Sequence, residues 1–427
     1  MTSENPPVPL EHGDGPLTGY RVLDLADEKG QLCARLLAEL GADVIKVEPP
    51  RDGDATRSNG PFFKGEQGPN TSLYWWAMNA GKRSITLQLK LEAGRDILHR
   101  LVATSDIVIE TCTPGESAAL GLDYASLSAA NPGVILVSIT NFGQTGPYAR
   151  WASSDIVASA MGGHMHLNGD DEHGPVRTTA PQAFAQVNAQ AATGAMIALY
   201  ARAVNGGVGQ HVDVSMQEAM ANAMDHAQQT WDIRGVNTYG PGVGRQASGI
   251  RAGRYLFETS DGWITALQSG GLIGANANAA IDWLAETGDA RDLALPAWRT
   301  KLTSLTPLSP EERAYVEDPL SLFCKARKKE PLVEEAQRRG FGWAPVFSPS
   351  EIVESKQLAG RDYWVRVAHD DLGESFIYPG ALYKLSETPW RQRGRAPHVG
   401  EHNEEIYSGL LGMDAPELRR LKLKMVV

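Results

Sequence analysis

The chain has 427 residues, 42% of them hydrophobic and 21% charged, which suits two or more globular domains and argues against disorder. Its net charge of −11 argues against nucleic acid as a partner, although a local basic pocket could still hold an anionic cofactor. The first dozen residues do not resemble a signal peptide, and no stretch approaches the ~20 apolar residues that cross a bilayer, so we expect no membrane partner. The three cysteines, Cys33, Cys112 and Cys324, are far apart and predict a reducing cytoplasm without disulfides or a zinc site.

Strands and helices alternate in the first 140 residues. Residues 21–25 predict a buried strand, residues 31–40 a helix that Gly41 ends, and residues 43–47 the next strand. Downstream, strands are predicted at 84–89, 107–110 and 134–139, and a helix is predicted at 91–103. This alternation is typical of a Rossmann-like α/β domain with a parallel sheet.

The second half of the chain is organised differently. A long Ala-rich helix is predicted at 185–202, a strand at 209–215 and a helix at 216–228. From about residue 231, a glycine-rich loop and a predicted hairpin (254–258 with 263–267) indicate a smaller α+β domain. We therefore divide the chain into segments 1–230, 231–344 and 345–427, the last of which returns to mixed α/β structure.

Several short motifs occur in a characteristic order along nearly the whole chain. They are Gly15–Leu25, Leu40–Pro50 with Gly53, Asp54 and Arg57, Asn79–Ile85, Pro114–Gly115 with Leu120–Leu122 and Asn131–Pro132, Gly143–Tyr148, Leu385–Pro389, Ala396–Pro397 and Gly400–His402. Together they resemble the class III CoA-transferases, which include formyl-CoA transferase, carnitine CoA-transferase and methylacyl-CoA racemases. The resemblance implies a large Rossmann-like domain built from both termini, a small middle domain, and two subunits interlocked like chain links.

The resemblance also implies a catalytic aspartate, which this sequence lacks. In the family this carboxylate attacks an acyl-CoA thioester, and it lies in a segment like P-I-G-D-x-x-x-G before an Ala-rich helix. The helix is present here as Gly194–Leu199, but the aspartate position falls on Phe184 or, by a second count, on Ala185. No acid occurs from Thr178 to Tyr200. Neither a phenyl ring nor a methyl group can be acylated, so we predict no catalytic residue in this chain.

Cations that contact CoA phosphates in the family are also missing. The corresponding positions are Thr113, Ala119 and Thr140, and this loss weakens the expected binding of an anion. Arg51 and Arg57 remain as candidate CoA contacts, although solvation explains Arg51 better and a structural ion pair explains Arg57 better.

Other residues could in principle replace the nucleophile. Asp155 occupies a family position that often carries an acid and is interpreted as structural, and the polar turn Asp170–Glu172 is interpreted as a solvated loop. His164 and His166 could ligate a metal from one strand, but no third ligand is evident, so no metal is expected. No G-x-S-x-G motif marks a serine nucleophile.

The glycine-rich loop has two interpretations. In the family a mobile glycine loop covers the reacting anhydride, so Gly240, Gly242, Gly244 and the adjacent Arg245 are candidates for a lid over a partner's site. A plain linker between domains explains the same glycines equally well.

These features favour a silent subunit of a heteromeric CoA-transferase. The resemblance extends to an enzyme of anaerobic toluene degradation that pairs a chain lacking the aspartate with one retaining it. This implies CoA transfer from succinyl-CoA to (R)-benzylsuccinate, CoA thioesters as substrates without a covalently bound cofactor, and an Asp-containing paralogue as partner in an interlocked heterodimer or heterotetramer. The alternatives are an acyl-CoA binding or regulatory protein, and a racemase or transferase that uses a different acid.

Overall fold

The computed structural model describes residues 15–169, 174–224, 226–237, 244–247, 250–266, 277–304 and 308–427. These residues form two compact units. The first unit contains the residues up to Gly162, residues 178–223 and residues 356–427, and the second contains residues 163–177 and 224–355.

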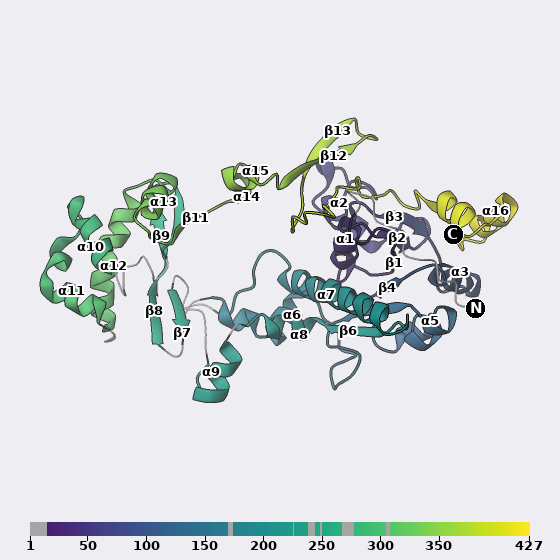
Figure 1. Ribbon diagram of the computed structural model, residues 1–427, viewed down its shortest axis with the longest axis horizontal. Helices are drawn as coiled ribbons and strands as arrows, with labels where there is room; N and C mark the ends of the chain where they lie inside the picture. Colours follow the sequence, from purple (N-terminus) through teal and green to yellow (C-terminus); the bar gives the residue numbers. More distant parts are fainter. Residues whose placement is uncertain are drawn as a thin grey trace. The chain divides into compact units, whose positions relative to one another are not determined.

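A parallel six-stranded sheet with the order β3-β2-β1-β4-β5-β6 is the centre of the first unit (Figure 1). Its strands are β1 (Arg21–Asp24), β2 (Asp43–Glu48), β3 (Arg83–Thr86), β4 (Ile107–Glu110), β5 (Ile135–Thr140) and β6 (His211–Ser215). All neighbouring strands are parallel, and β1 pairs with both β2 and β4. The direction of strand order therefore reverses between β1 and β4, as in a Rossmann fold.

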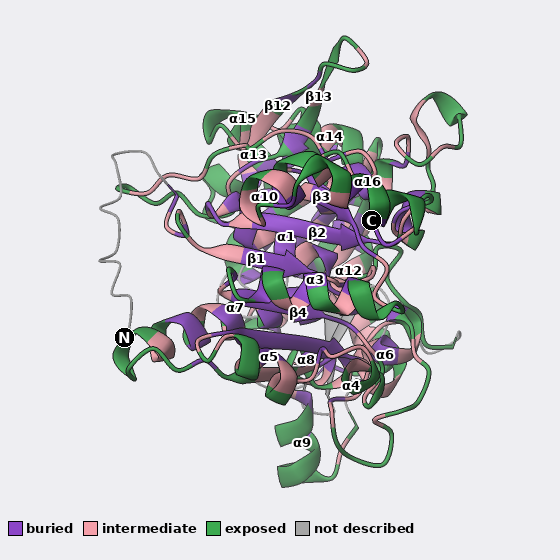
Figure 2. Ribbon diagram, turned by 90° about the vertical axis from the view of Figure 1, so that its right-hand side faces the viewer, coloured by how far each residue is buried: buried purple, intermediate pink, exposed green. Residues whose placement is uncertain are grey.

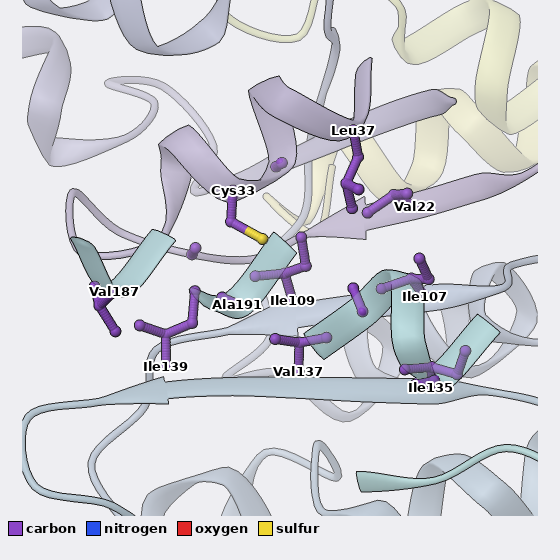
Figure 3. Close-up of a cluster of buried hydrophobic side chains, with 14 of the residues drawn as sticks. Val22, Cys33, Leu37, Ile107, Ile109, Ile135, Val137, Ile139, Val187 and Ala191 are labelled. Atoms are coloured by element: carbon purple, nitrogen blue, oxygen red, sulfur yellow. The ribbon is translucent and has the colours of Figure 1, made fainter. Parts of the chain in front are cut away.

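Helices cover both faces of this sheet, and the central strands are almost wholly buried (Figure 2). One face packs against α1 (Gln31–Glu39), α6 (Asp155–Met161), α7 (Gln182–Val204) and α8 (Met216–Asn222). The other packs against α3 (Glu92–Val102), α5 (Tyr124–Ala130) and α16 (Ala415–Leu423). Side chains alternate between the two faces of the sheet. Ile107 and Ile109 pack on the face covered by α1, α6, α7 and α8 (the α7 layer), whereas Val108 packs on the face covered by α3, α5 and α16 (the α3 layer). Figure 3 shows the α7 layer, where Cys33 and Val187 meet strand side chains.

Residues 356–427 return to this sheet. The backbone N–H of Gln88 bonds to Val426 O at 2.8 Å, and the Tyr407 hydroxyl donates to Thr86 O at 2.6 Å. The hairpin of β12 (Trp364–His369) and β13 (Glu374–Pro379) packs against Trp75 and Trp76 of α2 (Leu73–Asn79). Two short helices, α4 (Glu116–Ala119) and α15 (Lys356–Gly360), complete the unit. Both ends of the chain build the Rossmann-like unit, which confirms the predicted fold class.

The second unit has an antiparallel sheet of order β11-β10-β9 packed on helices. Its strands are β7 (Gly244–Ala247), β8 (Ile250–Arg254), β9 (Leu256–Thr259), β10 (Gly262–Ala266) and β11 (Trp343–Val346), and β7 pairs separately with β8. Its helices are α9 (Ala227–Arg234), α10 (Ala277–Glu286), α11 (Pro296–Thr303), α12 (Pro310–Lys325), α13 (Lys329–Arg338) and α14 (Pro349–Val353). The predicted hairpin is present as β9 and β10, which pair Thr259 with Gly262. The predicted helix 216–228 is wrong, because α8 ends at Asn222 and a separate helix begins at Ala227.

Within the described ranges, no helix combines the length and apolar character that crossing a bilayer requires.

Candidate functional site

The sequence motifs meet in a buried polar network at the carboxyl ends of β1 and β2. Lys82 Nζ lies 2.7 Å from Asp24 Oδ2 and donates at 2.8 Å to both Asn79 Oδ1 and the backbone oxygen of Gln31. All four residues are buried, and the three bonds use every donor of the ammonium group. Asp24 belongs to the Gly15–Leu25 motif, whereas Asn79 and Lys82 both belong to the Asn79–Ile85 motif, so this network joins the two motifs.

A second lysine extends this network. Lys46 Nζ lies 3.0 Å from Asp54 Oδ2 and also contacts Ala26 O. Burial disfavours its charged form, but the carboxylates of Asp24 and Asp54 outweigh burial and raise the Lys46 pKa. Burial opposes ionisation of Asp54 too, yet Lys46 and Thr56 lower the pKa of Asp54 to about 2. For Lys82, by contrast, burial prevails over Asp24 and lowers the pKa to about 8.

Arg57 lies in a structural ion pair. Its Nε and Nη2 bond to the two carboxylate oxygens of Glu48 at 2.6 and 2.7 Å, and its guanidinium carbon lies 3.7 Å from the ring centre of Trp75. Nη2 also donates to Pro397 O at 3.1 Å, and the side chain is buried. A Cβ on Gly53, whose φ is +71°, would lie 2.7 Å from Glu48 Oε2, so the motif glycine makes room for this pair. The donors of Arg57 are therefore used within the protein.

Two exposed arginines at the same edge of the sheet differ from Arg57 in having no such partner among the residues that the structure describes. Arg51 follows β2 with a φ of +74°. Arg150 comes from the loop after β5, and its Nη2 would lie 3.2 Å from a Cβ on Gly115, in the turn after β4. Neither guanidinium has an ion pair among the described residues. The sequence analysis missed Arg150, because its position beside that turn depends on the fold.

The expected position of the nucleophile lies in the first turn of α7. Phe184 is partly buried and packs against the core of the α7 layer, and Ala185 follows it. Helix α7 contains no Asp or Glu over its 23 residues. The first turn therefore places a phenyl ring where the family resemblance leads us to expect a carboxylate.

A carboxylate does reach this turn, but from outside the helix. Asp155 Oδ1 accepts hydrogen bonds from the backbone N–H groups of Ala183 at 2.8 Å and Phe184 at 3.3 Å. Pro181, the residue before α7, provides no side-chain cap. Asp155 thus takes the position of a capping residue and faces the positive end of the helix dipole.

Asn188 joins this turn to the loop between β1 and α1. Its Oδ1 accepts from the backbone N–H of Cys33 at 2.7 Å, and its Nδ2 donates to Lys29 O at 2.7 Å and Phe184 O at 2.6 Å. Asn188 is fully buried. Sequence reasoning gave it no role.

Several predicted residues cannot be placed or are placed differently. Asp170–Glu172, Gly240 and Gly242 lie outside the described residues, whereas Gly244 and Arg245 belong to β7. His164 and His166 lie on a short 3₁₀ turn rather than on the predicted strand. Within the described part of the chain, no three His, Cys, Asp or Glu side chains are grouped as a metal site requires.

The cysteines and the positions of the missing cations offer no substitute chemistry. Burial raises the pKa of Cys33 and Cys324, and burial with the carboxylate of Glu110 raises the pKa of Cys112 to about 12, so all three remain thiols. Thr140 is buried and accepts a bond from the N–H of Gly143, while Thr113 precedes the turn before α4 and Ala119 ends that helix.

The sheet order, with the motif-bearing loops at its carboxyl edge and both chain ends contributing, defines a Rossmann-like α/β protein. The sequence model of CoA-transferase family III matches residues 17–403, and the chain belongs to this family. It is 35% identical, over 91% of this chain and 92% of the relative, to the subunit BbsE of succinyl-CoA:(R)-benzylsuccinate CoA-transferase of Thauera aromatica. It is 30% identical to the beta subunit of succinyl-CoA–L-malate CoA-transferase of Chloroflexus aurantiacus, over 96% and 98% of the two chains. A crystal structure of a CAIB/BAIF family protein from Brucella suis superposes with a TM-score of 0.80 at 28% identity, covering 93% of this chain and all of that one. These relatives support a role in CoA transfer, with CoA thioesters as the substrates.

Proposed function

We propose that this chain is the non-catalytic subunit of a heteromeric CoA-transferase. The observation that carries the proposal is the first turn of α7, where Phe184 and Ala185 stand in place of an acid. Covalent transfer needs a carboxylate that attacks the thioester carbonyl, releases the CoA thiolate and forms an acyl anhydride. Phe184 and Ala185 have no group that can form this bond.

Asp155, the acid that bonds to the first turn of α7, is a poor replacement for the nucleophile. Asp155 lies at the right turn, but its Oδ1 is engaged by two backbone N–H groups and the residue is only 6% exposed. An attacking carboxylate must reach a thioester and become acylated, which would break these bonds and uncap α7. This argues against the alternative of a transferase or racemase that uses a different acid.

The partner and substrates follow from the same proposal. The complete site belongs to an Asp-containing paralogue, interlocked with this chain in a heterodimer or heterotetramer in the cytoplasm. The donor is succinyl-CoA and the acceptor (R)-benzylsuccinate, as in the name of the relative from Thauera aromatica. The loop that contains Gly240, Gly242, Gly244 and Arg245 then serves as a lid for the partner's site.

The test is CoA exchange from succinyl-CoA to (R)-benzylsuccinate, measured by chromatography of the CoA esters. The chain is assayed alone, the Asp-containing paralogue alone, and the two after co-expression. Exchange that appears only with both chains, and disappears when the paralogue's aspartate is changed to asparagine, supports the proposal. Robust exchange by this chain alone would overturn it. A co-purified pair whose exchange does not depend on this chain would favour a regulatory protein.

A further inference from the structure

Ligands of open α/β sheets bind where the strand order reverses, which here is between β1 and β4. The helix after the first strand contributes to such sites, because its first backbone N–H groups point toward the ligand and favour an anion. In this chain that helix is α1, and it begins at Gln31. What occupies its amino end therefore decides whether this subunit can hold a CoA thioester of its own.

The side chain of Asn188 occupies that end. Its Oδ1 accepts a hydrogen bond of 2.7 Å from the backbone N–H of Cys33, in the first turn of α1. Its Nδ2 donates to Lys29 O, in the loop before α1, and to Phe184 O. Both amide hydrogens and the amide oxygen are thus used, inside a fully buried side chain. Displacing this amide would leave several buried polar groups without partners, which is costly.

The residues beside Asn188 are packed just as closely. A Cβ on Gly30 would lie 2.7 Å from Ala26 Cβ and 2.9 Å from Thr111 Cγ2, so the loop has no spare room there. The side chain of Gln31 is bonded to Thr56 Oγ1 at 3.0 Å and to Asn79 Nδ2 at 3.2 Å. These contacts hold the loop and the start of α1 in one position.

The charges around this loop do not by themselves exclude an anion. Asp27 and Glu28 lie on the loop and repel phosphate, but Lys29 pairs with Asp27. Arg51 follows β2, which neighbours β1, and Arg150 lies in the loop after β5, which neighbours β4; neither has an ion pair among the described residues. The obstacle to a ligand is therefore the amide of Asn188 more than a lack of cations.

We propose that Asn188 is a specificity-determining residue that keeps CoA thioesters out of this chain's own Rossmann-like site. Asn188 lies one helical turn after Phe184 on α7, and its Nδ2 donates to Phe184 O at 2.6 Å. A glycine at position 188 would remove the donor to Lys29 O and leave the N–H of Cys33 with only its longer bond to Gly30 O at 3.1 Å. The inference deepens the proposed function and rests on it, since it explains why the silent subunit carries no second working site.

The test is binding of CoA to the purified full-length chain by isothermal titration calorimetry. We expect no binding by the wild-type chain at about 1 mM CoA, and at least about tenfold tighter binding by Asn188→Gly. Thr193→Gly is the matched control, because Thr193 lies on the exposed side of α7 and the same helix bears the same glycine penalty of about 1 kcal/mol. Asn188→Ala, which avoids that penalty, is the second variant if Asn188→Gly does not fold.

Two results would overturn the inference. One is CoA binding by the wild-type chain as tight as that of Asn188→Gly. The other is a folded Asn188→Gly or Asn188→Ala chain, verified by its thermal melting curve, that binds CoA no better than Thr193→Gly. Binding is measured on the isolated chain and exchange on the co-expressed pair, so failure of this inference is distinguishable from failure of the proposed function.

Discussion

Asp155 and Ala183 are joined by a hydrogen bond of 2.8 Å that caps α7 from a different helix. Asp155 is the first residue of α6, so its carboxylate fixes α6 to the amino end of α7. The first turn of α7 is thereby capped although Pro181, the residue before it, provides no side-chain cap. The acid nearest to the expected nucleophile position thus has a structural explanation.

Replacing Asp155 should therefore affect stability and not the chemistry of the complex. We expect Asp155→Ala to lower the free energy of unfolding by about 1–2 kcal/mol, because two backbone N–H groups lose their acceptor. Asp155→Asn keeps an acceptor oxygen and should cost less. Urea unfolding measures both changes. The rate of CoA exchange per folded complex should stay near that of wild type. If Asp155→Asn abolishes exchange in a complex that still assembles, Asp155 is the nucleophile.

Restoring the acid alone should not restore the reaction. In Phe184→Asp the new carboxylate would lie close to Asp155, and two like charges at one helix end disfavour ionisation of both. The lost phenyl ring is only partly buried, so we expect a cost of about 2 kcal/mol in unfolding free energy. The purified variant, assayed alone for exchange from succinyl-CoA, should show none. Measurable turnover would mean that the rest of an active site is intact in this chain.

The strands were predictable to within a few residues, because buried parallel strands are short apolar runs between polar turns. Residues 107–110 are such a run, and β4 has these bounds. The predicted helix 216–228 was wrong because its apolar pattern continues through the break after Asn222. That break falls at the boundary between the two compact units, after Ala223, which the local pattern does not reveal.

The sequence predicts that Phe184 or Ala185 occupies the expected position of the acid, and both residues lie in the first turn of α7. The contacts of the site could not be predicted, since Asn188 bonds to a backbone N–H 155 positions away and Arg57 to a backbone oxygen 340 positions away. Only the fold brings these groups together.

Arg57 and Arg51 should behave differently when replaced. Arg57→Lys cannot make the two parallel bonds to Glu48 or cover Trp75 in the same way, so we expect a loss of about 2–4 kcal/mol in unfolding free energy. Arg51→Ala removes an exposed side chain and should change stability by at most about 0.5 kcal/mol. Urea denaturation compares the two. Equal and small effects would contradict the structural ion pair of Arg57.

Stability should fall as the solution is acidified below neutral pH, in part because of the buried His369 and the half-buried His402. His369 is buried against Trp76 and hydrogen-bonded to the Tyr378 hydroxyl at 3.0 Å, and His402 accepts the N–H of Ser84. Burial lowers the pKa of both imidazoles, so the unfolded chain, with a histidine pKa of about 6.5, takes up these protons first. The two neutral imidazoles therefore contribute fully to the free energy of unfolding above about pH 6.5. This contribution is lost as the pH falls from there through the pKa of each imidazole in the folded chain.

Urea midpoints at pH 7.5 and pH 5.5 measure this effect on the full-length chain, at about one unit above and one below the unfolded histidine pKa. We expect His369→Gln to be less stable than wild type at pH 7.5, because the ring contacts are lost, but to lose less stability between the two pH values. His166→Gln, at an exposed position, is the control and should keep the wild-type difference. If His369→Gln shows the same pH dependence as wild type, protonation of this imidazole does not contribute to acid destabilisation.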